Sequence, residues 1–313
     1  MNVFVTGATG FLGFSLTRAL AGGGHRVTGL ARTDASRDRA LRAGLGGAGV
    51  EVVVSPLETL AELPARTECV VHVAGLLSRP GLAWSGAMAA NLGATVRLLR
   101  LASVAHASRF VVISSQSVYG SNGAPWSEDA PLNPLGPYAT SKAAAEVTAS
   151  AFADAFDVRI ARLSRLYGVS PFTRWDELSG RLARASADGT PMEVRGSGEQ
   201  RLDLLHVDDA ARGVAELAVH ADLPAGIYNL GSGASASLNE LVTLIAALAA
   251  ERGLPAPRIV RRPDVSPGGP ARLELDASKV ARALGWRAQV SLRQGLGEMV
   301  DARRGSCGEK RVD

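Results

Sequence analysis

The chain has 313 residues, of which 46% are hydrophobic and 20% are charged, a composition that excludes a disordered protein. Its net charge of +4 comes from scattered arginines, so a nucleic-acid-binding surface is not indicated. No apolar run reaches the roughly 18 residues of a membrane span. The distant Cys69 and Cys307 do not form a disulfide framework. The first residues are typical of a strand rather than a signal peptide. We expect a cytoplasmic globular protein with no metal, membrane or nucleic-acid partner.

The chain opens on a short apolar run that leads directly into a glycine-rich turn. Val3-Phe4-Val5 predicts a buried strand, and the glycines of TGATGFLG at 6–13 lead into a helical pattern. This setting of strand, turn and helix is the one in which a glycine fingerprint binds a dinucleotide. Its glycines permit a tight turn, a close approach of pyrophosphate and close packing of the helix. We therefore expect cofactor contacts from Gly7, Thr9, Gly10, Phe11, Leu12 and Gly13.

Strand-like runs and helical patterns alternate along the first half of the chain. The runs lie near 3–5, 26–31, 50–54, 69–74, 109–114 and 157–163. Such alternation predicts an α/β protein with a Rossmann-type doubly wound parallel sheet. The pattern breaks after Gly168 and resumes near Leu204. We therefore expect a dinucleotide-binding domain that comprises residues 1–168 and 203–229. A smaller C-terminal substrate-binding lobe would comprise 169–202 and 230–300, and residues 301–313 would form a flexible tail.

Three side chains in the middle of the chain can carry acid–base chemistry. Ser115 follows a buried run, at the sheet edge where ligands of open α/β proteins bind. Tyr138 and Lys142 are four residues apart in a helical pattern, so they share one helical face. A nearby ammonium lowers the pKa of a phenol, as general acid–base catalysis requires. Only three of the 34 basic residues are lysines, which indicates that residue 142 needs a compact ammonium.

Together these motifs resemble those of extended short-chain dehydrogenases/reductases of the NAD-dependent epimerase/dehydratase family. The resemblance also rests on HVAG at 72–75, SSQSVYG at 114–120, PYATSK at 137–142, HVDD at 206–209 and YNLGSG at 228–233. It implies that Tyr138 exchanges the proton, while Lys142 binds the nicotinamide ribose and depresses the Tyr138 pKa. It further implies that Ser115 hydrogen-bonds the reacting oxygen. Cofactor contacts are implied for Ala74, Gly75, Leu76 and Ser164.

The chain departs from the family at the adenosine end of the expected cofactor site. Many members carry Asp after the second strand, where this chain has Ala31 followed by Arg32. An arginine there can accommodate a 2′-phosphate, although Asp34 is an alternative ribose ligand. Where the family often has Gly-Asp-Leu, this chain has Ser55-Pro56-Leu57. The leucine is retained, but the aspartate is missing. We therefore expect NADP as the cofactor, with NAD as the alternative.

The chain also departs from the family on the substrate side. Gln116 and Ser117 stand where 4,6-dehydratases carry Asp-Glu, which disfavours dehydration. Leu202 stands where nucleotide-sugar enzymes often have an arginine. Arg201 lies one residue away, and Arg262 could also serve in recognising a diphosphate. Trp84 fits a pocket wall and a packed core equally well. The expected substrate contacts are Ser78, Arg79, Trp84, Gln116, Arg165, Arg201 and Arg262.

The resemblance implies an NAD(P)-dependent oxidoreductase that reduces or oxidises a keto or hydroxyl group. The substrate class implied is a sugar nucleotide or a related polyhydroxylated metabolite. The missing ribose-binding acid favours net reduction with NADP, and the alternative is an epimerase with tightly bound NAD. A non-catalytic dinucleotide sensor is disfavoured because Ser115, Tyr138 and Lys142 are all present.

Extended members of the family commonly dimerise through two long helices, here expected at 88–105 and 138–156. Small apolar residues on these segments would allow close helix packing; they are Ala90, Ala94, Ala145 and Ala149. We therefore expect a homodimer.

Overall fold

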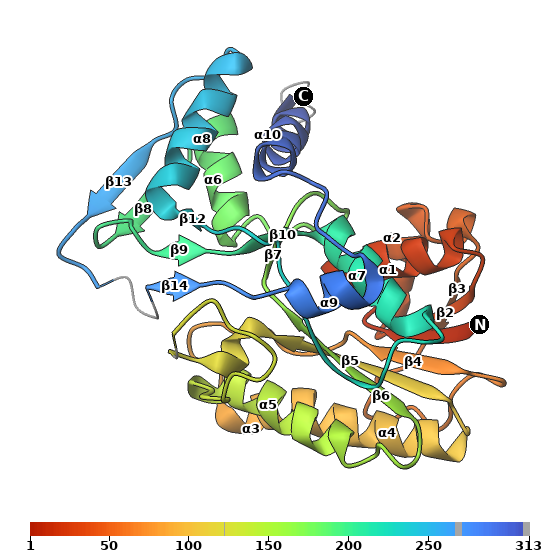
Figure 1. Ribbon diagram of the computed structural model, residues 1–313. Helices are drawn as coiled ribbons and strands as arrows, with labels where there is room; N and C mark the ends of the chain where they lie inside the picture. The colour runs from red at the N-terminus through yellow and green to blue at the C-terminus, as the bar shows by residue number, and fades with distance from the viewer. Residues whose placement is uncertain (122, 267–270, 309–313) are drawn as a thin grey trace.

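A seven-stranded parallel sheet forms the centre of the molecule (Figure 1). The computed structural model describes residues 1–121, 123–266 and 271–308. The strands of the central sheet are β1 (Asn2–Thr6), β2 (Arg26–Ala31), β3 (Glu51–Val54), β4 (Cys69–His72), β5 (Arg109–Ser115), β6 (Asp157–Leu163) and β11 (Gly226–Leu230). Their spatial order is β11-β6-β5-β4-β1-β2-β3, and every neighbouring pair is parallel. The Rossmann-type fold predicted from the sequence is confirmed.

Helices cover both faces of this sheet because successive side chains of a strand point to opposite sides. Val3 and Val5 of β1 enter one apolar core, whereas Phe4 enters the other. One face carries the helices α1 (Phe11–Gly22), α2 (Asp34–Arg42) and α7 (Val207–Val219), with the 3-10 turn η1 (Gly46–Ala48). The other carries α3 (Trp84–Ala87), the π-helical η2 (Met88–Gly93), α4 (Ala94–Val104) and α5 (Gly136–Ser150).

A smaller lobe with its own apolar core stands over one end of the sheet (Figure 1). It contains α6 (Leu178–Ala187), β8 (Met192–Arg195), β9 (Arg201–Leu202), β12 (Ala236–Ser237), α8 (Leu238–Glu251), β13 (Ile259–Arg262), β14 (Arg272–Leu273) and α10 (Leu292–Gly308). In this lobe β8 pairs with β13, and β9 lies between β12 and β14. The short strands β7 (Arg165–Tyr167) and β10 (Leu204–His206) pair where the chain passes between the two bodies.

The boundaries of the lobe differ from the expected ones at two places. Val280 of α9 (Ser278–Leu284) and Trp286 pack in the apolar core shared with α1 and α7, so this segment covers the central sheet. Residues 301–308, expected in a tail, continue α10. The helix is held because Leu296, Met299 and Val300 are buried in the core of the lobe. Residues 309–313 of the expected tail lie outside the described residues.

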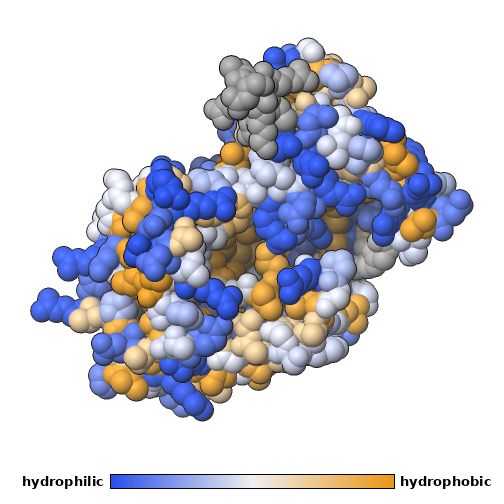
Figure 2. Space-filling view, turned by 180° about the vertical axis from the view of Figure 1, so that it is seen from behind, coloured by the Kyte–Doolittle hydropathy of each residue, from blue (hydrophilic) through white to orange (hydrophobic). Residues whose placement is uncertain are grey.

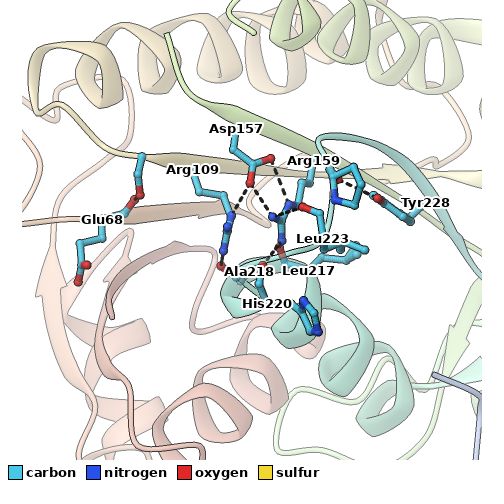
Figure 3. A network of polar contacts seen from close by, with 11 residues as sticks. Glu68, Arg109, Asp157, Arg159, Leu217, Ala218, His220, Leu223 and Tyr228 are labelled. Carbon is cyan, nitrogen blue, oxygen red and sulfur yellow. Dashed lines mark hydrogen bonds and ion pairs between the residues drawn. The ribbon is translucent and has the colours of Figure 1, made fainter. Parts of the chain in front are cut away.

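A polar network joins α7 to the start of β5 and β6 (Figure 3). Asp157 accepts hydrogen bonds from Arg109 Nε at 2.8 Å and from Arg159 Nη2 at 2.6 Å. The two guanidinium groups also donate to carbonyls at the end of α7, which are those of Leu217, Ala218 and His220. These carbonyls have no partner within the helix, and an arginine is a suitable donor for them. The network therefore fixes α7 to the edge of the sheet where the strands begin. Thr6 and Ser115 lie at the opposite edge, where β1 and β5 end.

None of the helices in the described parts of the chain has the length and hydropathy needed to cross a bilayer.

Candidate active site

A cavity of about 960 Å³ lies between the central sheet and the lobe. Its walls include the turn after β1, the ends of β2 and β5, the segment after β4, the first turns of α5 and the segment after β6. Seen from behind, the molecule is hollowed between its two parts, and hydrophobic residues lie inside the hollow (Figure 2). The strand order reverses between β1 and β4, and open α/β sheets bind their ligands at such a reversal.

The glycine-rich turn forms one end of the cavity, and two of its glycines are required by close packing. Gly7 has a φ of +70°, and a Cβ on it would lie 2.8 Å from the Ala74 nitrogen. A Cβ on Gly13 would lie 2.0 Å from the Gly7 carbonyl oxygen. Helix α1 starts at Phe11 without a side-chain cap, so its amino terminus suits an anionic phosphate. All the residues expected to contact the cofactor here line the cavity: Gly7, Thr9, Gly10, Phe11, Leu12 and Gly13.

Arg32 and Leu57 line the cavity near this turn, together with Glu58, which the sequence interpretation missed. The Arg32 guanidinium lies 3.7 Å from the Glu58 carboxylate, and both side chains are exposed. Asp34 starts α2 and pairs with Arg37 at 2.7 Å. Among the described residues, Asp34 is not part of the cavity wall. This end of the cavity thus presents a paired cation instead of a free one.

Ser115, Tyr138 and Lys142 meet at the wall of the cavity formed by β5 and α5. Both side chains line this wall, and Ser115 lies near enough to Tyr138 to influence its phenol. The Lys142 ammonium donates to the carbonyl of Ile113 at 2.9 Å. The 3-10 turn η3 (Gln116–Tyr119) follows β5 at once, and its Ser117 amide donates to Ser115 Oγ at 3.2 Å. A phenol, a hydroxyl and an ammonium therefore line the same wall of the cavity.

The ionisation of these groups differs from the expectation that Lys142 depresses the Tyr138 pKa. Burial raises the pKa of Tyr138 above its usual value, and the nearby Ser115 hydroxyl opposes that rise. Burial also lowers the pKa of Lys142 to about 8. The expectation fails in the protein alone because the ammonium contacts the Ile113 carbonyl and burial dominates at the phenol. Nearby, burial followed by the Lys142 charge lowers the pKa of His72 to about 3, so this imidazole is neutral.

Asn91, a buried residue that the sequence interpretation missed, holds the cavity wall after β4. Its Oδ1 accepts from the Leu76 amide at 2.8 Å, and its Nδ2 donates to the Leu76 carbonyl and to Ser141. A Cβ on Gly75 would lie 2.7 Å from Asn91 Oδ1 and 3.3 Å from Lys142 Nζ. Asn91 belongs to η2, a π-helical turn where one continuous helix was expected. Its side chain fixes Leu76, which lines the cavity together with Ala74 and Gly75.

The expected substrate residues divide into two sets. Ser78, Arg79, Gln116 and Arg165 line the cavity, as does Ser164, which was expected at the cofactor. Among the described residues, Trp84, Arg201 and Arg262 are not part of the wall. Trp84 is 54% exposed, so it is neither a pocket wall nor a packed core residue. The Arg201 guanidinium instead binds Ser235 and Glu240 within the lobe.

Other side chains occupy the substrate end of the cavity. Arg174 and Glu177 line it, and Glu177 lies 3.2 Å from Arg174 and 3.5 Å from Arg165. Gln116 is 7% exposed, and its Oε1 is buried without a hydrogen-bond partner in the described structure. A buried acceptor without a partner is costly, so a ligand hydroxyl at this point would be stabilising. The cavity therefore fits a dinucleotide at its glycine turn and a hydroxyl-bearing molecule beside Ser115.

The described residues contain no group of three or more His, Cys, Asp and Glu side chains that could hold a metal.

Comparisons with known proteins agree with this geometry. The sequence profile of the NAD dependent epimerase/dehydratase family matches residues 3–231. The chain is 32% identical to the dTDP-glucose 4,6-dehydratase of an Actinoplanes strain, over 96% of this chain and 97% of that protein. It is 31% identical to the UDP-glucose 4-epimerase of Mycolicibacterium smegmatis, over 96% and 98% of the two chains.

One similar solved structure is that of MoeE5 in complex with UDP-glucuronic acid and NAD. It has a TM-score of 0.86 and 32% identity, and the match covers 98% of this chain and 100% of that one. The same protein in complex with UDP-glucose and NAD gives a TM-score of 0.84.

Proposed function

The chain belongs to the NAD-dependent epimerase/dehydratase family, and on that basis we propose a hydride-transfer reaction at a secondary hydroxyl or ketone of a sugar nucleotide. It is an enzyme of the extended short-chain dehydrogenase/reductase type. The proposal rests above all on the position of Ser115, Tyr138 and Lys142, which share one cavity with the glycine turn. The relatives that act on or bind sugar nucleotides support the substrate class.

The residues of the cavity have separate tasks in this reaction. Bound nicotinamide dinucleotide supplies the acceptor or donor of the hydride. The Tyr138 oxygen takes the proton from the substrate hydroxyl during oxidation and returns it during reduction. Ser115, which lines the same wall of the cavity, would hydrogen-bond that oxygen and orient it. Lys142 would hold the ribose hydroxyls of the cofactor.

The cofactor that we propose is NAD, the alternative in the sequence interpretation, rather than NADP. Arg32 is the cation that led us to expect NADP, and Glu58 lies 3.7 Å from it. The Glu58 carboxylate partly offsets the charge of Arg32 and would repel a 2′-phosphate bound beside it. The NAD in the similar solved structures supports the same choice. The glycine turn and α1 would hold the phosphates of either cofactor.

Epimerisation is the second candidate, and the residues after Ser115 favour it over dehydration. Gln116 and Ser117 place an amide and a hydroxyl at the substrate end, where dehydratases of the family have two acids. An epimerase needs only the proton-exchanging group and a hydride that returns to the other face of the ring. The relative named as a UDP-glucose 4-epimerase supports this candidate.

We further propose that the protein is a homodimer formed through α4 and α5. Two of the alanines expected at the interface, Ala145 and Ala149, are buried inside the chain, so they cannot contact a partner. Val104 on α4 and Val147 on α5 are instead 79% and 66% exposed. Apolar side chains this exposed on neighbouring helices are stabilised when a second copy covers them.

The function is tested by mixing the NAD-loaded enzyme with UDP- and dTDP-sugars and following both nicotinamide absorbance and product structure by NMR. Accumulation of NADH indicates net oxidation, whereas a new sugar epimer with unchanged NAD indicates epimerisation. Loss of water from the sugar would exclude both candidates. Cofactor binding without any turnover across the panel would indicate a sensor.

A further inference from the structure

Helix α5 carries a third polar side chain on the face that presents Tyr138 and Lys142. Glu146 follows Lys142 by four residues, so the three side chains lie along one side of the helix. Glu146 is 2% exposed, and among the described residues it is not part of the cavity wall. A carboxylate is costly to bury. Because Glu146 does not touch the cavity, contact with a ligand does not explain its burial.

The partners of Glu146 lie on the strands behind the catalytic group. Its carboxylate accepts from Arg162 Nη2 of β6 at 2.6 Å and from the Ser114 hydroxyl of β5. Arg162 also donates to the Tyr119 hydroxyl at 2.8 Å, which in turn donates to Asn229 of β11 at 2.8 Å. Ser114 directly precedes Ser115. The carboxylate thus connects α5 to the strand ends that carry the site.

The charges around Lys142 leave Glu146 as its negative neighbour. Lys142 is 7% exposed, and its ammonium donates a hydrogen bond to the neutral carbonyl of Ile113. The titratable groups that interact with it are His72 on β4, which is neutral, and Glu146 on α5, while Tyr138 lies one turn away on the same helix. Burial lowers the pKa of Lys142 to about 8, and the charge of Glu146 opposes that fall. Arg162 bonds to Glu146.

We propose that Glu146 is a positioning residue that supplies the buried counter-charge of the Lys142 ammonium and fixes its helix turn to β5 and β6. This inference rests on the proposed function in one respect: the ammonium matters because Lys142 would hold the cofactor. Without the Glu146 carboxylate, the Lys142 ammonium would lose its proton at a lower pH. The enzyme would then lose activity near neutral pH.

The ionisation of Lys142 can be measured directly because the chain has only three lysines, Lys142, Lys279 and Lys310. Lysine labelled with ¹³C gives a simple NMR spectrum, in which Lys142→Arg identifies the signal of interest. In the full-length protein, with and without NAD, we expect a titration midpoint of about 8 for Lys142. In Glu146→Gln the midpoint should fall by about one pH unit or more. The other two signals should keep their midpoints.

Arg162→Gln is the matched control because it breaks the same ion pair and leaves the carboxylate in place. The Lys142 midpoint should stay at the wild-type value or rise in this variant. An unchanged midpoint in Glu146→Gln, or an equal fall in both variants, would overturn the proposal. If Glu146→Gln does not fold because Arg162 is left unpaired, the double variant Glu146→Gln/Arg162→Gln replaces it. Its midpoint is then compared with that of Arg162→Gln, and a fall of the same size is expected.

The pH profile of kcat/KM separates this inference from the proposed function. Its high-pH limb should move down together with the NMR midpoint in Glu146→Gln. A lower midpoint in a protein that turns over no sugar nucleotide would leave the role of Glu146 intact and reject the proposed function alone. A loss of activity with an unmoved midpoint would reject the role of Glu146.

Discussion

Arg32 and Glu58 face each other at the adenosine end of the cavity, with 3.7 Å between guanidinium and carboxylate. Arg32 is the first residue after β2, and Glu58 lies beyond the end of β3, which pairs with β2. The charge that would attract a 2′-phosphate is therefore partly compensated by the protein itself. We therefore expect cofactor preference to depend on this pair rather than on the arginine alone.

Removing the carboxylate should move the preference toward NADP. In Glu58→Gln, Arg32 is free to bind a 2′-phosphate, so the NADP dissociation constant should fall about tenfold relative to that of NAD. In the double variant Glu58→Gln/Arg32→Ala, this gain in NADP affinity should be lost. Titration calorimetry with both cofactors measures the ratio. Glu62→Gln removes an exposed carboxylate elsewhere and should leave the ratio of the two dissociation constants unchanged. A wild-type protein that binds NADP more tightly than NAD would refute our choice of NAD.

Replacing the phenol should abolish the chemistry while leaving the cofactor in place. Tyr138→Phe keeps the ring but removes the exchanging proton, so kcat should fall by about 10²–10⁴. The dissociation constant of the cofactor should change less than about threefold, because Tyr138 is assigned the proton and not the phosphates. Steady-state kinetics and calorimetry give the two numbers. The control Tyr228→Phe also loses a hydroxyl, but outside the cavity wall, and should keep the wild-type kcat. Near-normal turnover in Tyr138→Phe would exclude Tyr138 as the acid–base group.

The network in Figure 3 predicts a stability effect that is independent of the site. Arg159 is fully buried, and Arg159→Met would leave Asp157 and the carbonyls of α7 without its hydrogen bonds. The free energy of unfolding should fall by about 3–5 kcal/mol. Urea denaturation provides this value, and cofactor affinity should be unchanged. The exposed Arg26→Met should cost far less, and similar losses in the two variants would show that the network contributes little.

A charge at the centre of the proposed interface should separate the subunits. Val147→Arg places a cation on the exposed face of α5, where the second copy would have to bury it. Sedimentation velocity at micromolar concentration should show a dimer for the wild type and a monomer for the variant. Val265→Arg changes an exposed valine outside α4 and α5 and should remain dimeric. A monomeric wild type would exclude the interface.

The sequence predicted those parts of the fold that local chemistry determines. The strands β1 and β5 lie close to their expected positions because each contains a continuous apolar run, which marks a strand buried on both faces. The glycine turn was recognisable because its spacing reflects contacts within a few residues. Ser115, Tyr138 and Lys142 were expected together because the order of strands and helices brings their positions to one edge of the sheet.

Other features depend on residues that are distant in the sequence. Glu58 meets Arg32 only because β3 pairs with β2, and Arg201 turns away because Ser235 and Glu240 lie beside it in the lobe. The π-helical turn around Asn91 has no signature in apolar periodicity. The extension of α10 arises from packing on the lobe, which the polar composition of 301–308 conceals.

The chain passes back and forth between the sheet and the lobe, through β10 and α7, then α8, then α9 and finally α10 (Figure 1). No single cut therefore yields a cofactor module and a specificity module, and limited proteolysis between them would release two incomplete cores. Grafting the lobe of a relative would require matching every junction at once. New specificity in this architecture is therefore more accessible through point changes in the cavity wall than through exchange of modules.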